Sequence, residues 1–554
     1  MFVSPENFFT ENVSDFAAFK LEKGSVSFGQ MKKDVARYAS HFAGSKHEDF
    51  VLYVEGDAVL FATLFFALLQ AKKRVMLPSS EKMAEDFSKS ENLPVITNKK
   101  TLSANLFDIP KDLPECEFDF INMRESRVCF FTSGSTSAPK MIEKTFATLS
   151  DETKNSASIM GRFEDCAVVS TCEPFHLYGM LWRLLYPMSL KMPAHSITIR
   201  DPETLIAIQK QNQKVLFITT PSFIEAVARH RELYDFPQNV AAITTSGGLL
   251  KEKACADAKE IWGAIPTEIF GSTESGGIAS RNRGVSDSWS VFGEVEIGID
   301  ARGCLLAKSP YALGGEFQTN DIVEIFCGGR KFNFFGRIDR LVKIGETQLN
   351  IPDMENAVLA HEFVENCHVD FDGNALRALI VLNSEGRRFF MENGRLKLLS
   401  EINRRVKESF YSKFSLRKIK VVNSIPTNAQ GKILKGEIKK NFNLKTEEPI
   451  ICDIKKHDFG ADMEIFFAAE SAYFNGHFSM AKILPGAIQL HFAINFAKKL
   501  FDKTDYPKRV KRLKFSNIIR PREIVLLSIK NGENSCTFSY SKQGLPCSSG
   551  VLEF

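Results

Sequence analysis

Short apolar runs and longer amphipathic segments alternate along residues 1–338. The segments at 58–71, 223–233 and 251–262 have the length and apolar spacing of helices. Strands separated by helices favour a mainly parallel sheet that is covered on both faces. The pattern therefore predicts a large α/β domain over 1–338, with strands at 49–54, 74–78, 167–171, 215–219 and 241–245.

The remainder of the chain has two further patterns. Residues 339–442 mix helical and extended segments and predict a small α+β unit. The charged stretch 443–455 indicates a linker. Beyond it, one apolar helix begins at Gly486 and several extended segments follow. One helix on an antiparallel sheet is an α+β layer architecture, which we expect for residues 456–554.

Composition narrows the class of protein. A chain of 554 residues is too long for one core, and 44% hydrophobic with 25% charged residues is typical of soluble globular proteins. The formal net charge of +4 does not indicate a nucleic-acid partner. Eleven cysteines without a C-x-x-C pair or a Cys/His cluster indicate neither disulfides nor a zinc site, and they fit a cytoplasmic protein. The apolar run 58–71 is too short to span a membrane.

A run of small hydroxyl residues follows the apolar segment 127–131 and ends in Pro and Lys. Small residues let backbone N–H groups converge on one point, hydroxyls add donors, and a lysine supplies a charge for phosphate oxygens. A plain polar turn is the alternative interpretation. The candidate phosphate ligands are Thr132, Ser133, Gly134, Ser135, Thr136 and Lys140.

Further polar residues stand where predicted strands end, which is where ligands bind in open α/β sheets. Gly247 and Gly248 allow a flat base to approach the backbone. In the segment 270–274, an aromatic ring can stack on a base, a hydroxyl can bind phosphate and a carboxylate can hold a hard cation. Without other evidence, a carboxylate at the end of a strand is more often a solvent-exposed side chain than a metal ligand. The candidates in this segment are Phe270, Gly271, Thr273 and Glu274.

The order of these motifs resembles the adenylate-forming superfamily of acyl-CoA synthetases, peptide-synthetase adenylation domains and luciferases. The resemblance covers about residues 1–440 and includes T-S-G-S-T-x-x-P-K, P-F-H-x-x-G, G-x-T-E, T-x-D, G-R-x-D-x-x-V-K and P-x-x-x-x-G-K. It implies that ATP, Mg²⁺ and a carboxylate give an acyl-adenylate, which then passes its acyl group to a thiol. The thiol would be CoA or the phosphopantetheine of an acyl carrier protein.

The resemblance also implies roles for single residues. His176 would line the carboxylate pocket, Glu274 would bind Mg²⁺, and Asp321 would accept hydrogen bonds from ribose. Arg337 would contact the nucleotide, Asp339 would be the hinge pivot, and Lys432 would close over the carboxylate and the α-phosphate.

Four positions in the ligase part depart from the family pattern. Ser137 replaces a Gly of the phosphate loop, Phe270 replaces a Tyr, and Asn320 replaces the Gly of T-G-D. In Ile344-Gly345-Glu346 the Gly near the thiol tunnel is displaced or replaced. The last change leaves both CoA and a carrier-bound thiol open as acceptor.

The C-terminal pattern F-x-G-H-F-x-x-x-x-I-L-P-G-x-x-Q-L resembles the hot-dog β-hydroxyacyl carrier-protein dehydratases. The resemblance implies that His477 removes the α-proton and that backbone N–H groups at Gly486 polarise the thioester carbonyl. His491 stands where those enzymes have an acidic residue that protonates the departing hydroxyl. A hot-dog domain that only binds or hydrolyses thioesters is the alternative.

Residues 498–522 contain ten Lys and Arg against two Asp, which indicates either a solvated face or a docking surface for an acidic acyl carrier protein. Hot-dog domains complete their sites as dimers, so we expect a homodimer through 456–554. The sequence thus predicts a fatty or aryl acid ligase fused to a dehydratase of one acyl pathway, such as aryl-polyene or fatty-acid synthesis. A proofreading thioesterase and a decayed acyl-binding scaffold are the alternatives.

Overall fold

The computed structural model describes residues 2–90, 92–99, 113–132, 140–229, 231–312, 314–344, 347–410, 414–427, 433–443, 448–457, 459–469, 471–474, 482–501, 503, 505–532 and 535–554. The chain forms two compact units, which divide between Ile338 and Asp339. Residue 338 is also the predicted end of the large domain, and Asp339 is the predicted hinge pivot. None of the described helices is long and apolar enough to cross a membrane.

The first unit contains a sheet whose middle strands are parallel, as the sequence predicts. From β12 outward the strands are antiparallel, which the apolar pattern did not predict. The strand order is β15 (Glu296–Ile299), β16 (Cys304–Lys308), β17 (Glu316–Phe326), β18 (Lys331–Arg337), β14 (Trp289–Val291), β13 (Gly276–Asn282), β12 (Thr267–Ser272), β11 (Val240–Thr245), β10 (Lys214–Thr219), β8 (Cys166–Ser170), β9 (Ala194–Thr198), β1 (Ala17–Lys20) and β2 (Ser25–Ser27).

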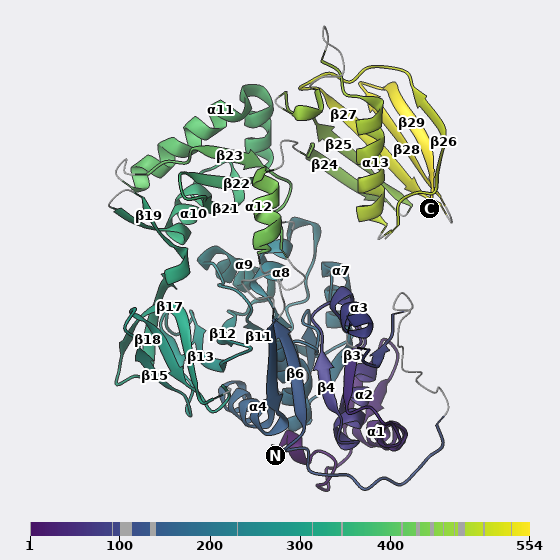
Figure 1. Ribbon diagram of the computed structural model, residues 1–554, viewed down its shortest axis with the longest axis vertical. Helices are drawn as coiled ribbons and strands as arrows, with labels where there is room; N and C mark the ends of the chain where they lie inside the picture. The colour runs from purple at the N-terminus through teal and green to yellow at the C-terminus, as the bar shows by residue number, and fades with distance from the viewer. Residues whose placement is uncertain are drawn as a thin grey trace. The chain divides into compact units, whose positions relative to one another are not determined.

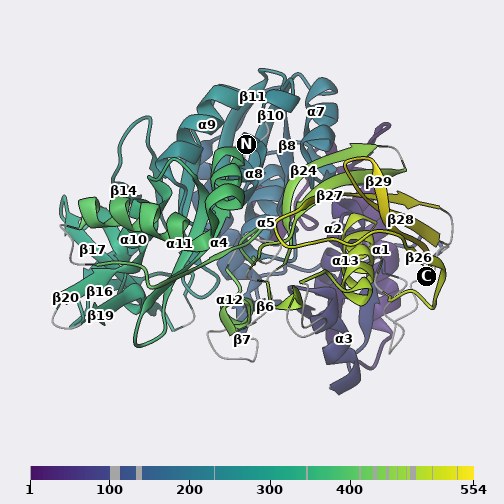
Figure 2. The same ribbon diagram turned by 90° about the horizontal axis from the view of Figure 1, so that it is seen from above.

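A second sheet of this unit has the order β5 (Val95–Thr97), β3 (Asp49–Tyr53), β4 (Arg74–Leu77), β6 (Arg127–Thr132) and β7 (Lys140–Thr145). Figure 1 shows β3, β4 and β6 side by side, and Figure 2 shows β8, β10 and β11. The helices of the unit are α1 (Phe28–Ala43), α2 (Ala58–Gln70), α3 (Glu81–Ser90), α4 (Phe146–Met160), α5 (Leu177–Gly179), α6 (Tyr186–Ser189), α7 (Pro202–Lys210), α8 (Pro221–Ala228) and α9 (Glu252–Trp262).

Helix α2 shows how the sequence produces one of these elements. It is apolar around its whole circumference and is almost completely buried, as expected for a helix inside a large core. Asp57 caps its first turn, because the Asp57 carboxylate accepts a hydrogen bond of 3.0 Å from the backbone N–H of Leu60. The run 58–71 is therefore a core helix, as its length predicts.

The second unit begins with a small α+β part. Its strands are β19 (Leu341–Ile344) with β20 (Thr347–Asn350), and β21 (Val364–Phe371), β22 (Leu376–Leu382) and β23 (Lys418–Val421). Its helices are α10 (Ile351–Leu359), α11 (Ser384–Ser409) and α12 (Lys435–Asn443), and α11 has one non-helical residue, Gly394.

The C-terminal part is one helix, α13 (Gly486–Leu500), against an antiparallel sheet (Figure 1). The strand order is β24 (Ile450–His457), β25 (Gly460–Phe466), β27 (Ile524–Asn531), β28 (Ser535–Lys542), β29 (Leu545–Glu553) and β26 (Arg509–Phe515). The predicted helix and antiparallel sheet are both present. Strand β24 lies largely inside the predicted linker 443–455, so the sheet begins before residue 456.

A buried amide joins this helix to the sheet. The Gln489 side chain donates to the Leu484 carbonyl (3.1 Å) and accepts from the Ser548 hydroxyl (2.6 Å). The Tyr540 hydroxyl donates to the Gln489 carbonyl at 2.9 Å. Because all these groups are buried, each needs its partner.

The two parts of the second unit share one core. Ile450 and Phe466 belong to the same buried cluster as residues of α10, α11 and β21 to β23. Phe390 on α11 meets Phe466 edge-on, with ring centroids 6.4 Å apart. The Arg387 guanidinium donates to the Ile451 carbonyl (3.1 Å), and Asn423 bonds the N–H of Ile451 (3.0 Å). The second unit is therefore held together by apolar packing and by polar contacts to the first strand of its C-terminal sheet.

Candidate functional site

The parallel strands β8, β10, β11 and β12 end at one edge of the large sheet. The segments that follow them include His176, the turn Gly247–Gly248 and the pair Thr273–Glu274. Side chains cross-link these segments: the Tyr178 and Thr244 hydroxyls share a hydrogen bond of 2.7 Å, and the Ser246 hydroxyl donates to the Ile269 carbonyl at 2.9 Å. The structure thus brings three predicted motifs to one edge.

The turn after β12 is built by close backbone approach. A Cβ at Gly271 would lie 2.2 Å from the Gly276 carbonyl oxygen, so only glycine fits there. The Ser275 hydroxyl accepts from the N–H of Ser272 at 3.1 Å and donates to the Gly276 carbonyl at 2.8 Å. Thr273 and Glu274, which lie inside this hydrogen-bonded turn, are partly exposed.

Phe270 packs against a cluster of aromatic rings. Its ring meets those of Trp289, Phe332 and Phe334 at centroid distances of 5.1, 5.3 and 6.0 Å, each steeply inclined. These contacts hold β12 against β14 and β18 and fix the orientation of the Phe270 ring. The Phe270 ring is therefore already ordered for stacking on a base. That stacking stays a prediction.

Asp321 and Arg337 face each other across β17 and β18, and Arg337 donates to the Asp321 carboxylate at 3.3 Å. The N–H of Asp321 donates to the Thr319 hydroxyl at 3.0 Å. Arg302 holds the same turn, because its guanidinium donates to the Thr319 carbonyl (2.7 Å) and to the Asn320 side chain (3.0 Å). The sequence motifs predict Asp321 and Arg337 as site residues. They do not predict Arg302, which lies outside every motif.

A buried charge cluster supports the His176 segment from behind. Arg183 is fully buried and donates to the Cys172 carbonyl (3.0 Å) and to the Thr198 hydroxyl (2.6 Å). Burial lowers the pKa of Arg183, and the negative charge of Glu173 opposes that shift. A Cβ at Gly179 would lie 2.0 Å from the Glu173 carbonyl oxygen. The glycine of P-F-H-x-x-G therefore serves packing in this fold.

Several predicted residues fall outside the described part of the chain: Ser133, Gly134, Ser135, Thr136, Lys432 and His477. Thr132 and Lys140, which flank the predicted phosphate loop, are opposite each other in the antiparallel pair β6–β7. Lys140 is exposed at the start of β7. The two ends of the loop are thus fixed by strand pairing.

At the C-terminal site, α13 begins at Gly486, and its N-cap is Pro485. A Cβ at Gly486 would lie 2.5 Å from the Phe515 ring, so a side chain at this position would displace the aromatic ring. His491 is exposed on the helix, and its Nε2 lies 3.0 Å from the Asn495 side-chain nitrogen. The imidazole is therefore held by a neighbour one turn away, which sequence reasoning did not identify.

Two protein families match separate stretches of the chain. The family of AMP-binding enzymes matches residues 73–299, which include the sheet edge described above. The family of ApeI-like proteins, described as ApeI dehydratase, matches residues 453–551, which include α13. The chain joins an AMP-binding domain to an ApeI-like domain. Both predicted resemblances are confirmed.

Curated relatives of the AMP-binding domain are 4-coumarate–CoA ligases. The one from Cereibacter sphaeroides is 27% identical over 259 residues, which are 46% of this chain and 59% of the relative. The one from Rhodobacter capsulatus is 22% identical over 272 residues, which are 48% of this chain and 66% of the relative. The chain therefore spans less than two thirds of the length of these curated relatives.

Solved structures share the fold of the ligase part. A benzoate–CoA ligase from Burkholderia xenovorans has a TM-score of 0.64 at 19% identity, covering 79% of this chain and 100% of that chain. O-succinylbenzoate–CoA synthetase from Bacillus subtilis, solved with AMP, has a TM-score of 0.64 at 16% identity, covering 76% and 95%. The predicted fold class is thus confirmed: a large α/β domain and a small α+β subdomain, followed by the ApeI-like domain.

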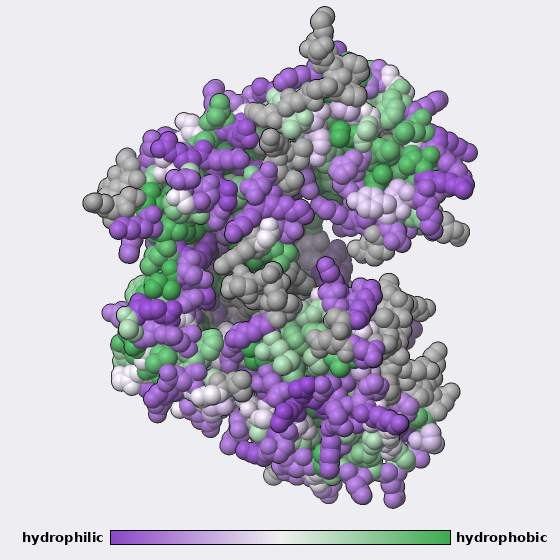
Figure 3. Space-filling model, viewed as in Figure 1, coloured by the Kyte–Doolittle hydropathy of each residue, from purple (hydrophilic) through white to green (hydrophobic). Residues whose placement is uncertain are grey.

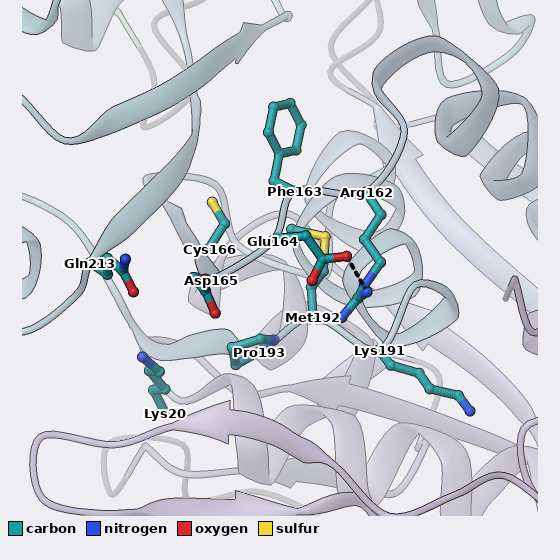
Figure 4. Close-up of a pocket in the computed structure, with 10 residues that line it drawn as sticks. All are labelled: Lys20, Arg162, Phe163, Glu164, Asp165, Cys166, Lys191, Met192, Pro193 and Gln213. Atoms are coloured by element: carbon teal, nitrogen blue, oxygen red, sulfur yellow. Dashed lines mark hydrogen bonds and ion pairs between the residues drawn. The ribbon is translucent and has the colours of Figure 1, made fainter.

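A cavity of about 320 Å³ in the AMP-binding domain lies at the opposite edge of the sheet, where β8 and β9 begin (Figure 4). Four of its charged groups have partners of their own: Arg162 pairs with Glu164, Lys20 donates to Asn212 (2.6 Å), and Lys191 donates to Ser14 (2.8 Å). This cavity is therefore separate from the site at the carboxyl ends of the strands.

Proposed function

We propose that the AMP-binding domain activates a small carboxylic acid with MgATP and transfers the acyl group to a thiol. The observation that carries this proposal is the convergence of His176, Gly247–Gly248 and Thr273–Glu274 at one sheet edge. The fold places ligands at such an edge. Asp321 and Arg337, paired on β17 and β18, supply the carboxylate and guanidinium that ribose and phosphate require.

The chemistry has two steps. An oxygen of the substrate carboxylate attacks the α-phosphorus of ATP, and pyrophosphate leaves. The thiol sulfur then attacks the carbonyl carbon of the acyl-adenylate, AMP leaves, and the thiol proton passes to solvent or to a base. Lys432 lowers the electrostatic cost of bringing the carboxylate to the phosphate in the first step.

The described residues contain no group of three or more His, Cys, Asp and Glu that could hold a metal ion. Mg²⁺ usually keeps several waters and binds through one or two carboxylates and substrate phosphates. A single partly exposed carboxylate, Glu274, fits an ion that arrives with ATP. When bound, the ion neutralises charge on the transferred phosphate.

The names of relatives and of proteins with the same fold suggest the substrate class. The 4-coumarate, benzoate and O-succinylbenzoate ligases all carry aromatic acids in their names. We therefore favour an aryl acid, with a fatty acid as the second class. CoA and the phosphopantetheine of an acyl carrier protein remain the candidate acceptors.

For the ApeI-like domain we propose dehydration of a 3-hydroxyacyl thioester. His477 would take the α-proton, the N–H groups at Gly486 would stabilise the enolate, and His491 would protonate the hydroxyl that leaves as water. The contact of His491 with Asn495 orients the imidazole for such a role. Thioester hydrolysis is the alternative, and it would release a free 3-hydroxy acid.

The surface of this domain supports two partners. All seven residues of the edge strand β26 are exposed, and four of them are Lys or Arg. Apolar side chains of the same strand, including Leu513 and Phe515, are exposed among them. Figure 3 shows hydrophobic residues interspersed with hydrophilic ones over the C-terminal sheet. Basic residues would attract an acidic carrier protein, and an exposed apolar edge suits a second copy of the chain. All eleven cysteines are thiols and not disulfides, which fits the cytoplasm.

The test of adenylation is acid-dependent pyrophosphate release with MgATP, over aryl, 3-hydroxy and fatty acids. We expect release with one acid class in the wild type and a loss of at least about a hundredfold in Lys432→Ala. Lys439→Ala, which removes an exposed lysine from α12, is the matched control. Release that is independent of acid, or unchanged in Lys432→Ala, would refute the proposal.

The test of the ApeI-like domain uses a 3-hydroxyacyl thioester of the acid class so identified. Dehydration gives an enoyl thioester and retains the thioester bond, whereas hydrolysis gives free thiol and acid. Mass spectrometry of the products separates the two outcomes. Free acid as the only product would replace the dehydratase proposal with the thioesterase.

A further inference from the structure

Glu152 on α4 is a fully buried carboxylate directly behind the Ser272–Gly277 turn. One carboxylate oxygen, Oε1, accepts a hydrogen bond of 2.6 Å from the backbone N–H of Gly277. A Cβ at Gly276 would lie 3.0 Å from the other oxygen, Oε2. Glu152 therefore packs against the backbone of the same turn that carries Thr273 and Glu274.

Lys144 on β7 is buried beside this carboxylate. Its ammonium donates to the Tyr311 carbonyl at 2.5 Å, and a Cβ at Gly276 would lie 2.5 Å from the Tyr311 Cβ. Lys144 is four residues after Lys140, at which β7 begins. Strand β7, which follows the predicted phosphate loop, is thus hydrogen-bonded to Tyr311. Tyr311 in turn packs against Gly276 in the turn that carries Glu274.

The charges in this arrangement depend on one another. Burial lowers the pKa of Lys144, and both Glu152 and Glu274 oppose that shift. Burial raises the pKa of Glu152, and Lys144 and the Gly277 N–H oppose that shift. Lys144 therefore lies within electrostatic range of both carboxylates, one behind the turn and one on it.

Among the residues that the structure describes, Glu152 Oε2 has no hydrogen-bond partner. A buried polar atom in this state is costly. Besides balancing the charge of the buried Lys144, the carboxylate also acts on the conformation of the turn through its bond to Gly277.

We propose that Glu152, together with Lys144, is a positioning residue that fixes the Ser272–Gly277 turn so that the Glu274 carboxylate is preorganised for MgATP. The proposal rests on the proposed adenylation. Glu152 touches no reacting atom; it acts through the backbone of Gly277. Fixing this turn makes the carboxylate available without ordering it at the moment of binding.

The test compares Glu152→Leu, which removes the acceptor for Gly277, with Glu152→Gln, whose amide oxygen retains it. The readout is the ratio of the affinities for MgATP and for ATP in EDTA, measured by calorimetry on the full chain. We expect Glu152→Leu to lower this ratio about tenfold and Glu152→Gln to stay within about threefold of the wild type. Lys144→Met should fall between them.

The matched control is Glu268→Gln, because Glu268 is a buried glutamate on β12 that binds Arg281 instead of the turn. It should lower the melting temperature but leave the affinity ratio unchanged. In turnover assays, Glu152→Leu should lower kcat and leave the KM for the carboxylic acid unchanged.

The outcomes separate this proposal from adenylation itself. A wild type that binds MgATP more tightly than ATP but adenylates no acid would refute adenylation, and the affinity ratio would still decide the role of Glu152. An unchanged ratio in Glu152→Leu would overturn the positioning role. A wild type whose ATP affinity is the same with and without Mg²⁺ would overturn it as well.

Discussion

In the AMP-binding domain, candidate residues stand on turns that charged side chains hold from behind, namely the buried Glu152 and Arg183 and the exposed Arg302. In the ApeI-like domain, by contrast, His491 is exposed on a helix that a single buried amide, Gln489, ties to the sheet. The first site is assembled across many strands and needs support at each of them. The second is presented by one helix, so its stability and its chemistry depend on different residues.

The largest expected effect is the loss of Glu268, which binds Arg281 through two bonds of 2.9 and 2.8 Å. Glu268→Leu leaves the buried guanidinium of Arg281 without its counter-charge. The free energy of unfolding of the AMP-binding domain should fall by about 3–5 kcal/mol. Differential scanning calorimetry would show its transition at lower temperature while the transition of the ApeI-like domain stays in place. A common shift of both would show that the domains unfold together.

Acid should act on the two regions unequally because of His195. Burial, with Arg183 and Lys20 nearby, lowers the pKa of His195 to about 4 from an ordinary value of 6.5. The folded domain therefore binds fewer protons than the unfolded chain between these values. Stability is lost as the pH falls from 6.5 to 4, by up to about 3 kcal/mol. Denaturant titrations of wild type and His195→Gln over this range would show a shallower loss in the variant; identical slopes would contradict the assignment.

Gln489→Leu should weaken the ApeI-like domain and leave the stability of the AMP-binding domain unchanged. The substitution leaves the Ser548 hydroxyl and the Leu484 carbonyl without their buried partner. We expect a loss of about 1–3 kcal/mol in the free energy of unfolding. Lys499→Ala, an exposed change on the same helix, is the control. Adenylation should be unaffected, and a lower adenylation rate would argue against separate support of the two sites.

The smallest expected effect on stability is that of Arg337→Gln. The Asp321–Arg337 pair is partly exposed, and its arginine side chain retains 45% of its accessible surface. Breaking it should cost no more than about 1 kcal/mol. ATP affinity should nevertheless fall, because the guanidinium faces the nucleotide in the proposed function. A variant that binds ATP normally would remove Arg337 from the candidate site.

Local pattern was sufficient to predict much of this molecule. The apolar runs became β3, β4, β8, β10 and β11, and the Pro-Gly signal marked the start of α13. Motifs at strand ends also lie at one sheet edge, since parallel strands place their carboxyl ends together.

Tertiary contacts account for what the sequence did not reveal. Glu152 and Lys144 lie in stretches without a recognisable motif, and only folding brings them beneath the turn of Glu274. Strand β24 overlaps the predicted linker, and its residues Asp453–His457 are exposed at the sheet edge. A charged, exposed edge strand and a linker are similar in composition, so composition alone does not distinguish them.

The core shared by α11 and the first strands of the ApeI-like sheet has a mechanical consequence. Phe390 and Phe466 are packed in one cluster, and the Arg387 guanidinium donates to the Ile451 carbonyl, so these parts are joined by side-chain contacts as well as by the chain. A rotation of the small α+β part about Asp339 would therefore rotate the ApeI-like domain with it. In the proposed function, the path of the thioester-binding site would then be set by this rotation and not by free diffusion at the end of a flexible linker.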